Sequence, residues 1–108
     1  FMKRPYNMQL MITDTSKQYL HQLDDQELEA LALGWHDAIK VIRSIMPAIG
    51  RTAAYNVTVS NGPGAGIYCD ILPYTQEMGG FEHMGFWVCQ GNPKEAAESI
   101  RTSLDALC

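Results

Sequence analysis

The sequence predicts an α+β domain in which an antiparallel sheet is covered by one long helix and one C-terminal helix. Three observations predict this class: helical periodicity over 24–46, strand-like segments on both sides of it, and a second helical segment after Asn92. Strands joined by hairpins form antiparallel sheets, and helices pack on one face of such sheets. The 108 residues leave room for one domain, because a second core would need roughly 50 more.

The first half of the chain is expected to form one strand and the long helix. Residues 5–12 alternate between apolar and polar side chains, which predicts a half-buried strand. Asp24 or Asp25 caps the helix, since a short carboxylate accepts hydrogen bonds from the free amides of the first turn. The helix buries one apolar stripe, made of Leu28, Leu31, Trp35, Ile39, Ile42 and Met46. Pro47 is expected to end it.

The second half is expected to form three strands and the C-terminal helix. Residues 55–60 are rich in β-branched side chains, and the glycine-rich segment 61–66 predicts a hairpin turn. Residues 65–72 alternate again, and aromatic and β-branched residues predict a fourth strand over 81–91. Pro93 takes the first position of the last helix, so the predicted order is β, α, β, β, β, α.

Composition and charge exclude several classes of protein. A net charge of −4 argues against nucleic-acid binding, because that binding needs clustered Lys and Arg. No apolar run approaches the roughly 18 residues that a membrane helix needs, so we expect no membrane segment. The three cysteines, Cys69, Cys89 and Cys108, form no CxxC pair. That usage suits a reducing compartment, and we expect a cytoplasmic protein.

Single residues do not indicate a catalytic centre. His21, His36 and His83 lie far apart, and none stands with a carboxylate or cysteine at a metal-ligand spacing. The segment 61–66 lacks both the GxxxxGK[ST] pattern and a following helix, so a hairpin turn is favoured over a phosphate-binding loop. An independent hydrolase would need a nucleophile and a base within reach of each other, and the sequence indicates neither.

Six short segments are informative through their order: RPYNMQLMI, LDDQELEALA, YNVTVSNGP, YCDILP, GGFEHMGFWV and NPKEAAESIR. Together they resemble the C-terminal half of galactose-1-phosphate uridylyltransferases and related nucleotidyltransferases of the histidine-triad superfamily. The likeness covers nearly the whole chain. It implies a histidine-triad-like antiparallel sheet in a single domain over 1–108, the second of two in a longer polypeptide that transfers a nucleoside monophosphate between sugar phosphates.

The resemblance also implies a ligand and partners. In that family the nucleophilic histidine lies in the N-terminal half, so this chain is not expected to be active alone. Phe81 and Glu82 match residues that contact the sugar nucleotide in that family. The alternative for Glu82 is a side chain that is simply exposed beside a loop. Gln90 occupies a position where many relatives carry a polar amide. We expect weak binding of a sugar nucleotide or sugar phosphate together with an N-terminal half-domain. An uncovered apolar sheet face also favours a homo-oligomer.

The chain departs from the family at the metal site. Where the family carries metal-binding histidines, this sequence has Ser60, Tyr68 and Asp70. Hydroxyl groups are poor ligands for zinc or iron, so we expect no metal and no cofactor. Two arrangements stay open: a small hydrogen-bonded cluster of the three side chains, or a packed Tyr68 with a solvated Asp70. A second function also stays open, that of a degenerate, non-catalytic module for ligand binding or dimerisation.

Overall fold

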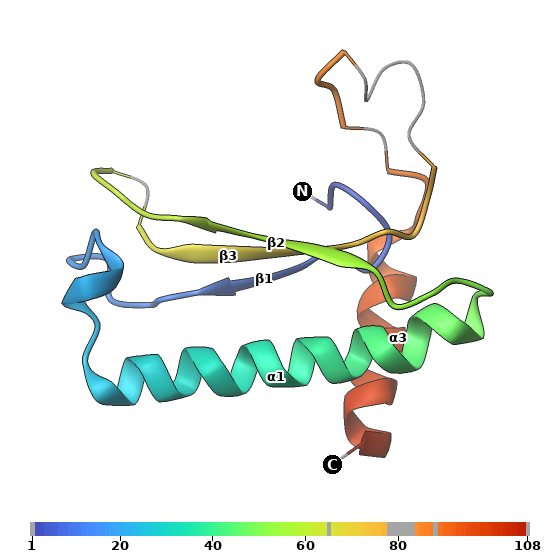
Figure 1. Cartoon of the computed structure of the whole chain (residues 1–108), viewed down its shortest axis with the longest axis horizontal. Coiled ribbons are helices and arrows are strands. Elements are labelled where there is room, and N and C mark those ends of the chain that lie inside the picture. Colours follow the sequence, from blue (N-terminus) through green and yellow to red (C-terminus); the bar gives the residue numbers. More distant parts are fainter. Residues whose placement is uncertain (1, 65, 78–83, 88, 108) are drawn as a thin grey trace.

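A sheet of three antiparallel strands lies against a long helix (Figure 1). The computed structural model describes residues 2–64, 66–77, 84–87 and 89–107. Its strands are β1 (Met8–Met11), β2 (Tyr55–Ser60) and β3 (Tyr68–Pro73), with β3 in the centre of the sheet. Its helices are the short η1 (Leu20–Gln22), α1 (Asp25–Ala48) and α3 (Pro93–Leu107). The predicted α+β class is confirmed.

The core lies between α1 and one face of the sheet. Ile71, in the middle of β3, is fully buried and packs with residues of α1, namely Ala38, Ile42 and Met46. Met8 and Val57 are the cross-strand partners of Ile71, and they close the core from both neighbouring strands. Each strand therefore directs apolar side chains toward α1.

The hairpin between β2 and β3 forms as predicted. The two strands pair antiparallel from Tyr55 opposite Pro73 to Ser60 opposite Tyr68. Gly62 and Gly64 in the connection have φ angles of 133° and 80°, a region that side chains with a Cβ rarely adopt. The glycine-rich segment therefore acts as a turn.

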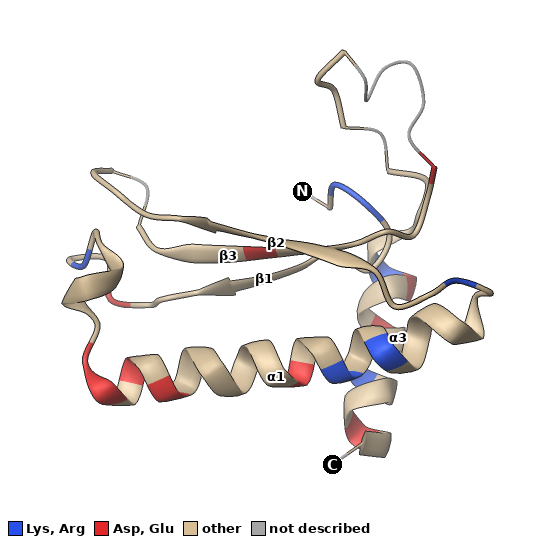
Figure 2. Ribbon diagram, viewed as in Figure 1, with Lys and Arg blue, Asp and Glu red and all other residues tan. Residues whose placement is uncertain are grey.

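The start of α1 is fixed by a capping box. The Asp24 carboxylate accepts a hydrogen bond from the Glu27 backbone N–H at 2.8 Å, and the Glu27 side chain accepts one from the Asp24 N–H at 3.1 Å. Lys17 forms an ion pair with Glu27 and stands 3.6 Å from the Asp24 carboxylate. Figure 2 shows the acidic first turn, where negative side chains are favoured by the helix dipole.

Asp24→Ala is expected to lower stability at neutral pH. The hydrogen bond from the Glu27 N–H holds the pKa of Asp24 below its usual value, and nearby Lys17 acts in the same direction. Because the pKa of Asp24 is lowered in the folded state, the ionised cap stabilises the fold fully at pH values above the usual pKa of the group. This stabilisation is lost as the pH falls through the lowered pKa of the folded state. Thermal unfolding at several pH values should show the variant and the wild type converging in acid. Asp25→Ala, which keeps the cap, should show a smaller difference at neutral pH.

Two expectations about α1 are wrong. Pro47 does not end the helix, which continues to Ala48, with the Ile49 N–H donating to the carbonyls of Ile45 and Met46. Pro47 lacks an N–H and lies in the last turn, and the helix ends one residue after it. Leu28, which was expected in the buried stripe, is instead 46% exposed. A helix of 24 residues measures about 36 Å, whereas the four residues of β1 span about 13 Å, so the first turns of α1 extend beyond that strand.

The predictions of the first and the fourth strand also need correction. β1 covers Met8–Met11 rather than 5–12, because the Asn7 N–H donates to the Arg4 carbonyl and closes a turn in which Tyr6 has a φ of 64°. Of the fourth strand predicted over 81–91, the described residues 84–87 and 89–91 are not in a strand, and the others lie outside the described residues.

The C-terminal helix starts at Pro93 as predicted, and the Asn92 side chain accepts a hydrogen bond from the Lys94 N–H at 2.9 Å. The expectation that both helices lie on the sheet is correct for α1, whereas α3 packs against α1 and crosses it near one end of the sheet (Figure 1). Within the described residues, neither helix combines the length and the apolar character that crossing a bilayer requires.

Candidate functional site

Ser60, Tyr68 and Asp70 lie on the sheet face that points away from α1. Tyr68 and Asp70 are two residues apart on β3 and therefore project from the same face. Ser60 on β2 is the cross-strand partner of Tyr68. Ile71, which alternates with Asp70, projects into the core beside α1. The pairing of the strands thus brings the three predicted positions onto one surface.

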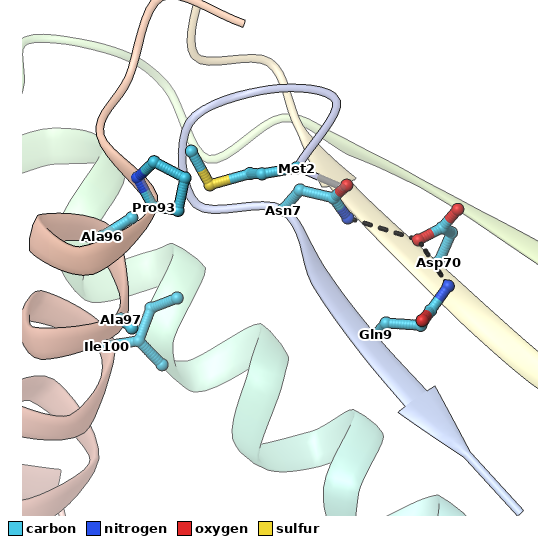
Figure 3. A pocket seen from close by; sticks show the side chains of 8 residues that line it. All are labelled: Met2, Asn7, Gln9, Asp70, Pro93, Ala96, Ala97 and Ile100. Atoms are coloured by element: carbon cyan, nitrogen blue, oxygen red, sulfur yellow. Dashed lines mark hydrogen bonds between the residues drawn. The ribbon is translucent and has the colours of Figure 1, made fainter.

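Asp70 is the buried member of this surface, with a side chain only 6% exposed. Its carboxylate accepts a hydrogen bond from the Lys3 ammonium at 2.8 Å and from the Asn7 amide at 3.4 Å. A longer contact of 3.5 Å joins it to the Gln9 amide (Figure 3). A buried carboxylate needs an opposite charge and hydrogen-bond donors, and the first nine residues of the chain supply both. We call these four residues the Asp70 network.

Neither arrangement left open by the sequence is found in full. Tyr68 is half-buried, but Asp70 is not solvated. Among the described contacts, no hydrogen bond joins the Asp70 carboxylate to Ser60 or Tyr68. Nor do three His, Cys, Asp or Glu side chains of the described residues converge to hold a metal ion. The cation beside Asp70 is the Lys3 ammonium.

A cavity of about 320 Å³ separates the Asp70 network from α3 (Figure 3). Its polar wall consists of Asn7, Gln9 and Asp70. Its apolar wall consists of Met2, Pro93, Ala96, Ala97 and Ile100. Polar groups of this kind orient a small ligand, while apolar contacts contribute burial. The described side chains that line the cavity include no hydroxyl, thiol or imidazole, and the Asp70 carboxylate is held by Lys3.

The positions expected to contact a sugar are only partly described. Phe81 and Glu82 lie outside the described residues. Gln90 has an exposed side chain, and its backbone N–H donates to the Gln76 side-chain oxygen at 3.1 Å. Gln90 does not line the cavity beside Asp70. The structure therefore does not bring Gln90 together with the Asp70 network.

The geometry indicates a binding surface and leaves its ligand open. No model of a known protein family matches this chain, and no curated protein matches it. The likeness of the six segments to uridylyltransferases therefore enters only as support for a proposal about function.

A second cluster joins the N-terminal segment to residues far along the chain, and sequence reasoning missed it. We call it the cation–aromatic cluster: Lys3, Arg4, Arg51, Tyr74 and Trp87. The Arg4 guanidinium lies 5.5 Å from the ring centroids of both Tyr74 and Trp87. The adjacent basic residues Lys3 and Arg4 were the one signal in the sequence, but nothing there links them to aromatic rings about 70 or more positions away.

Two ionisable groups of this part of the chain, Tyr74 just after β3 and Cys69 within it, have raised pKa values. The Tyr74 hydroxyl donates to the Glu77 carboxylate at 2.9 Å, and this hydrogen bond raises the pKa of Tyr74. Burial raises the pKa of the Cys69 thiol, which lies in the core face of β3. Both groups therefore keep their protons at neutral pH.

Proposed function

We propose that the chain is the C-terminal, non-nucleophilic domain of a cytoplasmic sugar-phosphate nucleotidyltransferase-like protein that transfers a uridylyl or adenylyl group to or from a hexose 1-phosphate. In this role the domain contributes contacts to the sugar nucleotide and to assembly with a second copy. The nucleophile is supplied by an N-terminal half-domain. The six ordered segments support this assignment, as does an antiparallel sheet with a long helix on one face and polar residues on the other, the arrangement expected of a histidine-triad-like fold.

The observation that carries the proposal is the cavity between the Asp70 network and α3. Hexose hydroxyls can donate to the carboxylate and amide oxygens of its polar wall, and the C–H face of a pyranose ring can pack on Ala96 and Ile100. At about 320 Å³ the cavity stands near the lower end of small-molecule sites, which run from roughly 300 to 1,000 Å³. That size suits the sugar alone, so the rest of a sugar nucleotide would contact the partner half-domain.

A second candidate function is a degenerate module of the same fold that binds a ligand or dimerises without turnover. The ion pair of Asp70 with Lys3 favours it, because the one carboxylate among the former metal positions is neutralised from within the chain. Ser60 and Tyr68 add only hydroxyl groups, which are poor metal ligands.

Gln9→Ala is expected to weaken sugar binding in the cavity. Calorimetry of the 108-residue chain with glucose 1-phosphate and UDP-glucose should give dissociation constants on the order of millimolar, because half of the site is missing. Loss of one ligand hydrogen bond should raise the constant about tenfold. Gln26→Ala, on the exposed start of α1, is the matched control and should bind like the wild type. Equal affinity of the Gln9 variant would contradict a sugar site here, and turnover by the chain alone would contradict a missing nucleophile.

The two candidate functions differ in what must precede the domain. The transferase proposal requires a His-Pro-His segment encoded upstream of Phe1, because the family's nucleophile lies in such a segment. Sequencing the upstream coding region decides this point. If no such segment is encoded, the transferase proposal fails for the whole protein and the degenerate module is the remaining function.

A further inference from the structure

Arg4 is a buried cation without a counter-ion among the described residues. It is 6% exposed, and its Nε atom has no hydrogen-bond partner. None of the ion pairs formed by the described residues includes its guanidinium. Buried charges are ordinarily paired, because the free-energy cost of moving an ion out of water is far larger than that of moving a neutral polar group.

The other two cations of the cation–aromatic cluster each have a carboxylate. Lys3 binds Asp70 at 2.8 Å, and Arg51 lies 3.4 Å from Glu77. Each aromatic ring also lies near two of the three cations: Tyr74 near Arg4 and Arg51, and Trp87 near Arg4 and Lys3. The described part of the cluster therefore carries one positive charge in excess, at Arg4.

Among the described contacts, neither Tyr74 nor Trp87 accepts a hydrogen bond from the Arg4 guanidinium. The Tyr74 hydroxyl is engaged with Glu77, and the indole N–H of Trp87 is a donor only. An arginine presents its N–H groups as a planar fork that matches the oxygens of a phosphate. Trp87 is 43% exposed, so the edge of the cluster that it forms borders solvent.

We propose that Arg4 binds the phosphate group of a phosphorylated ligand, in an anion site that it forms with Tyr74 and Trp87 of the cation–aromatic cluster. The preference for an anion follows from the uncompensated guanidinium. The choice of a sugar phosphate as the source of that anion rests on the proposed function. The same N-terminal segment provides Met2 and Asn7 to the cavity, so a single stretch of chain serves both the sugar site and the phosphate site.

Fluorescence of Trp87 tests the anion site directly. The chain has two tryptophans, so Trp35→Phe leaves Trp87 as the only reporter. In this background, titration with inorganic phosphate against sodium chloride of equal ionic strength should give a saturable change. Arg4→Gln should raise the apparent dissociation constant about tenfold or more, as expected for loss of a charge-assisted pair. Arg43→Gln, which removes an exposed arginine from α1, should leave the titration unchanged. An identical titration in the Arg4 and Arg43 variants, or no saturable change in the Trp35→Phe protein, would overturn the site.

Thermal unfolding provides a second measurement that does not need Arg4→Gln to fold. Phosphate should raise the unfolding midpoint of the wild type above its value in chloride, because a ligand that binds the folded state stabilises it. Arg4→Lys keeps the charge and loses the planar fork, so phosphate should raise its midpoint less. If Arg4 only packs against the rings, phosphate will shift the midpoints of both proteins equally or not at all, and the proposal fails.

Sugar phosphates separate this inference from the proposed function. Glucose 1-phosphate should bind more tightly than inorganic phosphate, and Arg4→Gln should weaken both. If glucose 1-phosphate binds no more tightly than inorganic phosphate or UMP, the sugar function fails and the anion site stands. If Arg4→Gln leaves glucose 1-phosphate binding unchanged while Gln9→Ala weakens it, the anion site fails and the sugar site stands.

Discussion

Ile42→Ala is expected to remove about 2–5 kcal/mol from the free energy of unfolding, the usual cost of truncating a fully buried isoleucine to alanine. Ile42 is 1% exposed and packs in the core with Ile71 of the central strand. A domain of this size is stable by about 5–15 kcal/mol, so the loss is a large share of the total. Urea denaturation followed by far-ultraviolet circular dichroism measures it.

Leu33→Ala is the matched control, because Leu33 lies on the same helix and is 59% exposed. Its effect should stay within about 0.5 kcal/mol, as for most surface substitutions. Equal losses in the two variants would contradict the packing of α1 on the sheet through Ile42, since the exposed and the buried face of the helix would then contribute alike.

Lys3→Met is expected to destabilise the protein by roughly 1–3 kcal/mol, because it leaves the Asp70 carboxylate buried without its cation. The Asp70 side chain is 6% exposed, and the remaining amide contacts from Asn7 and Gln9 are long, at 3.4 and 3.5 Å. Lys94→Met, at an exposed lysine of α3, controls for the loss of a positive charge. Urea denaturation of the three proteins at neutral pH makes the comparison.

The double variant Lys3→Met with Asp70→Asn separates pairing from simple truncation. Removing both charges should restore part of the lost stability, since a neutral amide can be buried beside Asn7 and Gln9 at lower cost than a lone carboxylate. A double-mutant cycle measures the coupling. Additive effects of the two changes would show that the ion pair does not contribute through its charges.

Local patterns predicted most of the elements because their causes are local. The capping box at Asp24, the β-branched run of β2 and the proline at the start of α3 each act within a few residues, and each element begins where it was expected. β1 is shorter than its alternating pattern because a turn closed by Arg4 and Asn7 takes up the first residues. Alternation shows which side chains can share a face, but it does not show where pairing begins.

Only the part of the candidate site that follows from strand periodicity and hairpin pairing could be predicted. The period of two placed Tyr68 and Asp70 together, and the hairpin brought Ser60 beside Tyr68. The partner of Asp70 could not be predicted, because Lys3 is 67 positions away and its approach depends on β1 pairing with β3. The sequence shows Arg4 only as a neighbour of Lys3, because the rings of Tyr74 and Trp87 that lie against it come from distant parts of the chain.

The central position of β3 governs the order in which the chain can fold. β1 and β2 both pair with β3, and β1 meets it across more than half of the chain. Closing a loop of that length before any strand contact forms slows folding. During synthesis, β1 and the apolar stripe of α1 emerge while their shared partner is still unmade. Among the described strands, β1 therefore pairs only after β3 has been made, and a nascent chain that stops before Tyr68 lacks the strand against which β1 and α1 pack.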